Sequence, residues 1–198
     1  MIDIRIQAEP FDIASEQESL WRERPQVGAL VTFVGLMRNM NEGDQVSRMI
    51  LEHYPGMTEK ALTAIAEDAV GRWDLQGIRI LHRVGELEPQ DPIVLVAVTS
   101  AHRGDAFRAC ELLIDYLKTR APFWKKEILE GDERWVDARA TDEKAAQRWE
   151  PAQGAASEEN GRQSAGRGGR DASNANKKRG QSVREALSED AESRISDV

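Results

Sequence analysis

The chain has 198 residues, a formal net charge of −8 at pH 7 and 40% hydrophobic residues. This length suits one domain with additional segments, and the acidic balance argues against a general nucleic-acid-binding protein, which would need a basic surface. Its single cysteine, Cys110, excludes both a disulfide framework within one chain and a cysteine-based zinc cluster.

The first half of the chain predicts strands interrupted by two helices. Alternating or β-branched runs typical of strands occur at 2–6, 27–37, 46–54, 77–87 and 92–100. Ser15 and Glu18 fit a capping box before a short helix. Thr58 can cap a longer helix that runs to about Trp73. The polar segment 37–45 is expected to be a loop.

The second half predicts another long helix, from about Asp105 to Thr119, which Pro122 prevents from continuing. Residues 123–139 are expected to be extended, and 141–149 to form a short final helix. Because strands and helices do not alternate as regular βαβ units, the order favours an α+β fold over a doubly wound sheet.

The composition changes sharply after Trp149, the last aromatic residue. Residues 150–198 contain nine acidic and eight basic residues, with Gly, Ser, Ala, Asn and Gln making up most of the rest. Such a segment cannot bury enough apolar surface to offset the entropy of ordering it. We therefore expect a folded domain over 1–149 and a disordered polar tail over 150–198.

The sequence also bears on localisation. The N-terminus lacks a basic region followed by an apolar run, so no signal peptide is expected. No apolar run approaches the roughly 20 residues that a membrane-spanning helix needs. A cytoplasmic protein without a membrane association is therefore expected.

One candidate anion site follows the hydrophobic strand 92–100. His102 and Arg103 come just before a predicted helix start, where free N–H groups and the helix dipole favour an anion. The forked guanidinium of Arg103 suits a phosphate, and a basic pocket in an acidic body would attract a small anion rather than a polyanion. The alternative is an ordinary polar loop in which Asp105 caps the helix.

A second candidate is the stretch DYLKTRAPFWKKE, which places Lys118 and Lys125 seven residues apart. Two ammonium groups held close together lower each other's pKa, and a lysine with a depressed pKa can act as a base or a nucleophile. Phe123 and Trp124 would supply an apolar wall that excludes water. The alternative is a solvated helix end, where lysines favour the dipole.

Other residues carry weaker signals. Met37 and Arg38 follow a strand, and Arg38 could meet the same anion or be an ordinary surface residue. Cys110 occupies a helix-core position, and a lone cysteine at such a position more often packs in the core than acts as a nucleophile. His53 and His82 lack metal-ligand spacing, so no protein-bound metal is expected. No cofactor is expected either.

Several motifs are more specific in combination: LEHYPGMTEKAL, HRVGEL, VTSAHR, DYLKTRAPFWKKE and RWVDAR, in this order. With them the chain resembles the large, catalytic subunit of molybdopterin synthase over about residues 3–149. The resemblance implies an α+β fold with a hammerhead-like mixed sheet and two main helices. It also implies a sulfurtransferase of molybdenum cofactor biosynthesis, which adds two sulfurs to cyclic pyranopterin monophosphate. The sulfur donor in this family is the thiocarboxylated C-terminal Gly-Gly tail of a small ubiquitin-like subunit.

The resemblance implies site residues and an assembly. Lys118 and Lys125 align with the catalytic lysines of the family. Substrate-binding positions align with Met37, Arg38, His102, Arg103, Lys126, Glu127 and Arg139. The family forms a heterotetramer around a homodimer of large subunits, and its counterpart of Arg139 acts across the dimer interface. Leu36 departs from the family, which often has a basic residue there, so one cation at the pocket rim is expected to be missing.

Two other functions are compatible with these residues. A regulatory module could keep the fold and bind a phosphorylated ligand without catalysis, but loss of Lys118 or Lys125 would be its signature, and both are present. Alternatively, sulfur could pass through a persulfide on Cys110, in which case replacing this cysteine would abolish activity.

The tail is predicted to be dispensable for catalysis, because the family's usual domain has no counterpart to it. A protein truncated at residue 150 should therefore match the full chain when both are assayed for molybdopterin with the small subunit and substrate. Loss of activity on truncation would contradict this prediction.

Overall fold

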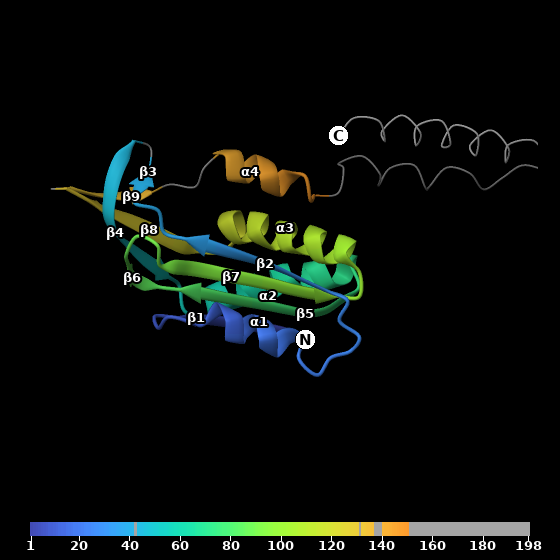
Figure 1. Ribbon diagram of the computed structural model, residues 1–198. Coiled ribbons are helices and arrows are strands. Elements are labelled where there is room, and N and C mark those ends of the chain that lie inside the picture. The colour runs from blue at the N-terminus through green and yellow to red at the C-terminus, as the bar shows by residue number, and fades with distance from the viewer. Residues whose placement is uncertain (42, 131, 137–139, 151–198) are drawn as a thin grey trace, which may run out of the picture. The chain divides into compact units, whose positions relative to one another are not determined.

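The computed structural model describes residues 1–41, 43–130, 132–136 and 140–150 (Figure 1). Arg139 and the tail from residue 151 lie outside these ranges, so the predictions made for them stay predictions. The helices are α1 (Ile13–Trp21), α2 (Met57–Arg72), α3 (Arg103–Arg120) and α4 (Ala140–Gln147). The strands are β1 (Ile2–Gln7), β2 (Ala29–Leu36), β3 (Met40–Asn41), β4 (Asp44–His53), β5 (Leu75–Arg83), β6 (Gly85–Leu87), β7 (Pro92–Ser100), β8 (Phe123–Leu129) and β9 (Glu133–Val136). Among the helices described here, none is long and apolar enough to cross a membrane.

A four-stranded sheet in the order β1-β5-β7-β2 forms the main core. Strands β1 and β5 are parallel, and the other pairs are antiparallel. Helices cover both faces of this sheet (Figure 1): α1 packs on one face around Leu20 and Leu95, and α2 and α3 pack on the other around Leu62 and Leu112. This explains why β7 is apolar at nearly every position rather than at alternate ones.

A second, antiparallel sheet follows the order β3-β4-β8-β9, with β6 beside β4. It has a smaller core, formed by Met37, Val46, Met49, Leu51 and Leu87. Strand β8 begins three residues after the end of α3, so the last turn of this helix leads directly into the second sheet. The two sheets and two long helices confirm the predicted α+β fold with a hammerhead-like mixed sheet.

Two helices begin at different residues from those predicted. Asp12 caps α1, because its carboxylate accepts a hydrogen bond from the backbone N–H of Ser15 at 2.7 Å, so the capping box at Ser15 is wrong. Helix α3 begins at Arg103, which makes His102 its N-cap residue and puts Asp105 in the first turn. The anion-favouring N–H groups of this helix therefore lie directly at His102 and Arg103.

The predicted loop 37–45 and the predicted helix cap at Thr58 also differ from the structure. Part of the loop pairs as β3 with the start of β4, and Gly43 permits the turn because its φ is 95°. Thr58 lies inside the first turn of α2, where its hydroxyl is 3.1 Å from the carbonyl oxygen of Pro122. This contact ties α2 to the turn that follows α3.

Candidate active site

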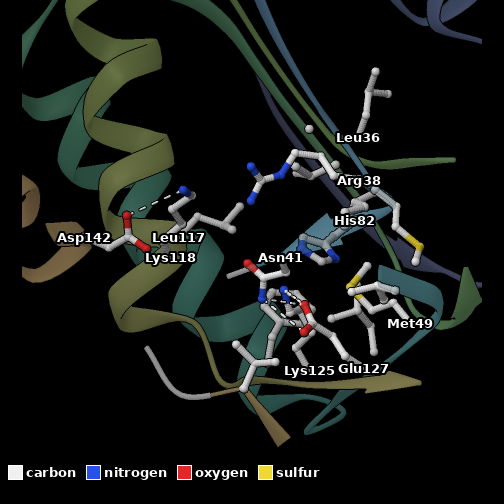
Figure 2. A pocket seen from close by; sticks show the side chains of 18 of the residues that line it. Leu36, Arg38, Asn41, Met49, His82, Leu117, Lys118, Lys125, Glu127 and Asp142 are labelled. Atoms are coloured by element: carbon white, nitrogen blue, oxygen red, sulfur yellow. Dashed lines mark hydrogen bonds and ion pairs between the residues drawn. The ribbon is translucent and has the colours of Figure 1, made fainter. Parts of the chain in front are cut away.

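A cavity of about 520 Å³ lies where the end of α3 meets the second sheet (Figure 2). Its apolar lining includes Val34, Leu36, Met37, Met49, Leu51, Leu117 and Phe123. Its polar lining includes Arg38, Asn41, His82, Lys118, Lys125, Glu127 and Asp142. Apolar walls with a few converging polar groups are typical of a small-molecule site.

The proline turn after α3 brings Lys118 and Lys125 of the DYLKTRAPFWKKE stretch to this cavity. Ala121 is extended, with φ −88° and ψ 129°, a conformation favoured immediately before a proline. The chain therefore leaves the helix at once and enters β8. Lys118 lines the cavity from the last turn of α3 and Lys125 from β8, with side chains 50% and 33% exposed.

The ammonium group of Lys125 is held by a buried carboxylate. Its Nζ lies 2.7 Å from Oε1 of Glu127, a residue only 2% exposed. Asn41 Nδ2 donates to the same carboxylate at 2.8 Å, and Arg134 Nη2 donates to it at 3.2 Å. Burial alone would raise the pKa of Glu127, but the hydrogen bonds from Lys125, Asn41 and Arg134 outweigh burial and lower it. Glu127 therefore stays ionised and fixes the Lys125 ammonium at the cavity wall.

Lys118 has a different and looser partner. Its Nζ lies 3.6 Å from Oδ1 of Asp142, which α4 contributes to the cavity (Figure 2). The two lysines thus each face one carboxylate, but only Lys125 is locked into a buried network.

The end of β2 provides the opposite rim. The guanidinium of Arg38 is directed into the cavity (Figure 2) and has no ion-pair partner among the residues with described positions. Leu36 also lines the cavity and is 53% exposed. Arg38 is thus the cation on this rim, and Leu36 leaves an apolar patch beside it.

His102 and Arg103 do not line this cavity. They lie at the start of α3 and Lys118 in its last turn, 15 residues beyond Arg103, which corresponds to about 22 Å along a helix. Within one chain, these two residues and the lysines therefore form separate sites, and the substrate-binding role of His102 and Arg103 stays a prediction.

Lys126 and Trp124 do not line the cavity either, because alternate residues of β8 point to opposite faces of the sheet. Lys126 Nζ lies 5.2 Å from the ring centroid of Trp135 on the neighbouring strand, and Trp124 is half exposed. Phe123 does line the cavity, so only one of the two predicted aromatic residues forms its wall. The substrate-binding role of Lys126 stays a prediction.

His82 also lines the cavity, although neither its motif HRVGEL nor its spacing assigned it a role in the site. Its Nδ1 is 2.8 Å from the carbonyl oxygen of Arg83, and its ring stacks on Phe123 with 3.8 Å between centroids. Burial lowers the pKa of His82 to about 4, so the ring is neutral near pH 7. Asn41 and Asp142 were missed for a similar reason: no motif links them to the lysines they neighbour in space.

Cys110 lies in the main core and does not line the cavity. Burial raises the pKa of its thiol to about 11, which makes the reactive thiolate scarce near neutral pH. Within the residues that the structure describes, no group of three His, Cys, Asp or Glu side chains is placed to hold a metal ion.

The fold and the cavity define an α+β protein with a lysine-bearing site suited to small anions. Residues 6–120 match the family model described as "MoaE protein". A Ralstonia nicotianae protein named "Molybdopterin synthase catalytic subunit" is 56% identical over 149 residues, which is 75% of this chain and 85% of the relative. The chain belongs to this family of molybdopterin synthase catalytic subunits, which confirms the resemblance drawn from its motifs and, with it, the sulfurtransferase class.

Solved structures agree with this assignment. The MoaE protein of Burkholderia ambifaria superposes with a TM-score of 0.65 at 53% identity, covering 75% of this chain and 98% of that one. Molybdopterin synthase from Staphylococcus aureus superposes with a TM-score of 0.63 at 36% identity, covering 67% and 95%.

The buried neutral His82 predicts a specific pH dependence of stability. Because its pKa is lower in the folded state than the ordinary value of 6.5, the unfolded chain binds this proton more readily between about pH 6.5 and 4. His82 should therefore contribute stability above pH 6.5 and lose it as the pH falls, by about 3 kcal/mol in all. Urea unfolding at pH 7.5 and 4.5 should show a smaller loss in His82→Gln than in the wild type, and equal losses would contradict the assignment.

Proposed function

We propose that this protein transfers two sulfurs from the thiocarboxylated C-terminus of a small ubiquitin-like subunit to cyclic pyranopterin monophosphate, and so makes molybdopterin in the cytoplasm. The observation that carries the proposal is the convergence of Lys118, Lys125 and Arg38 on one partly apolar cavity. Both the thiocarboxylate and the cyclic phosphate are anions, and cations attract them more strongly where apolar walls exclude water.

The surroundings of the two lysines support different roles. Glu127 keeps the Lys125 ammonium in one place, which suits a fixed charge that stabilises negative charge developing during sulfur transfer. Lys118 is more exposed and less tightly paired, which suits a group that exchanges protons or bonds covalently to the terminal carbonyl of the small subunit. On this view Glu127 acts on the substrate through Lys125.

A homodimer would complete the site. His102 and Arg103 lie too far along α3 to reach the lysines of their own chain, yet they carry the charge and hydrogen-bond donors that a phosphate needs. We infer that a second copy of the chain brings its His102, Arg103 and Arg139 to this cavity. With one small subunit at each cavity, the assembly would be a heterotetramer.

The small subunit would enter as an extended tail. Glycines at its end would let the backbone approach the lysines closely, because they have no Cβ to clash with the cavity wall. The names of the relatives, which describe a catalytic subunit, are consistent with a separate subunit that supplies the sulfur.

The two alternative functions fit less well. A persulfide carrier needs a reactive, accessible thiol, whereas Cys110 is 5% exposed in the main core with a raised pKa. A binding module without catalysis would not need two lysines converging on one cavity, each beside a carboxylate.

Reconstitution tests the function directly. The purified chain, mixed with a thiocarboxylated small subunit and cyclic pyranopterin monophosphate, should yield molybdopterin. Lys118→Ala should lower the rate about 100-fold or more, because it removes a group that moves protons or bonds to the acyl carbon. Lys60→Ala, an exposed lysine on α2, is the matched control and should behave as the wild type. No product from the wild type, despite a stable complex with the small subunit, would contradict the proposal.

The apolar rim at Leu36 yields a second prediction. Leu36→Lys would add a cation beside Arg38, so it should lower the KM for the pterin substrate about fivefold, as about 1 kcal/mol of added attraction would do. The kcat should change little, because the new charge lies at the rim. Leu36→Gln controls for polarity alone, and an equal drop in KM for both variants would rule out a charge effect.

A further inference from the structure

Helix α4 places an acidic residue, Asp142, at the cavity. No sequence motif indicated this residue. Asp142 lies four residues before Ala146, a spacing that places both on one face of α4, and Trp149 lies in the turn just after the helix. Ala146 is buried in the main core, and Trp149 packs edge-on against Trp73 with 5.9 Å between ring centroids. The face of α4 that packs against the domain is therefore the one that presents Asp142 to Lys118.

A buried carboxylate on α3 anchors the other end of this segment. Asp115 is 9% exposed and accepts hydrogen bonds from Arg148 Nη2 and Trp149 Nε1, both at 2.6 Å. It lies three residues before Lys118, so both project from neighbouring positions on α3. Because hydrogen bonds to a buried carboxylate are strong, the anchor holds α4 beside the catalytic end of α3.

We propose that Asp142 is a positioning residue that holds the Lys118 ammonium in the cavity. This inference rests on the proposed function. Lys118 is half exposed on a flexible stem, and Asp142 is its ion-pair partner at 3.6 Å, with no second one among the described residues. An exposed ion pair contributes little to the stability of the folded protein. The same ion pair can still lower the activation barrier considerably, because it holds the reacting amine near its attack geometry. Asp142 positions the ammonium of Lys118 as Glu127 positions that of Lys125, but at a longer distance, 3.6 Å against 2.7 Å.

A purely structural role for Asp142 makes a different prediction. Acidic residues in the first turn of a helix stabilise it through the helix dipole, and α4 has two of them, Asp142 and Glu143. Glu143 is exposed and does not line the cavity. It is therefore a matched control: replacing it removes the same charge from the same turn without touching Lys118.

The test uses the full chain in the reconstituted synthase. Asp142→Asn should lower kcat about tenfold while KM for both substrates stays within about twofold, because the variant misplaces a reacting group rather than removing a binding one. Asp142→Glu should recover most of the rate, since it restores the carboxylate. Glu143→Gln should retain wild-type kinetics, and both neutralised variants should show the same thermal midpoint.

A second measurement examines the anchor. Asp115→Asn should loosen α4 and lower kcat in the same direction as Asp142→Asn. Because both changes act through Lys118, their losses should not add in the double variant. Fully additive losses would show that the anchor and Asp142 act independently and would overturn the proposed link between them.

The remaining outcomes separate this inference from the proposed function. Wild-type kinetics in Asp142→Asn, alongside an inactive Lys118→Ala, would overturn the positioning role and leave the function intact. Equal losses in Asp142→Asn and Glu143→Gln would assign both residues to the helix dipole and overturn it as well. No product from the wild type would instead overturn the proposed function, and the positioning role with it.

Discussion

The site depends on the hydrogen bonds and ion pairs that surround the buried carboxylate of Glu127. An isolated buried charge costs several kcal/mol, so it persists only where donors surround it. Here the donors come from three strands: Asn41 on β3, Lys125 on β8 and Arg134 on β9. Satisfying one carboxylate therefore holds the β3 hairpin, β8 and β9 together, and it presents the Lys125 ammonium to the cavity.

The rest of the cavity follows from how the main core ends. The apolar strands of the four-stranded sheet pack against α3 along its length, as far as the last turn of the helix. The turn at Pro122 then directs the chain into the second sheet. The junction leaves a space with apolar walls and a neutral imidazole, into which cations project from the segment after β2, from α3 and from β8. Such surroundings strengthen the attraction between those cations and an anionic ligand.

Sequence patterns located the elements well but not the partners of the lysines. The strands, the long helices and the proline break are local signals of periodicity and backbone preference, and the structure confirms most of them. Asn41 lies 86 residues from Glu127 along the chain, and no local sequence pattern predicts a contact between residues so far apart. The expectation for Trp124 shows the converse: it neighbours Phe123 in sequence, but the pleat of β8 turns it to the other face.

The sequence by itself determined the fold class, the family and the pair of lysines, because these depend on hydrophobic periodicity and on motifs in a fixed order. Only the tertiary structure decided which groups share one cavity. It joined Asn41, His82 and Asp142 to the lysines, and it separated His102 and Arg103 from them by the length of α3. The physical reason is that electrostatic and hydrogen-bonded contacts act over a few ångströms in space, whereas their members are scattered along the chain and are brought together only by the packing of the sheets and helices.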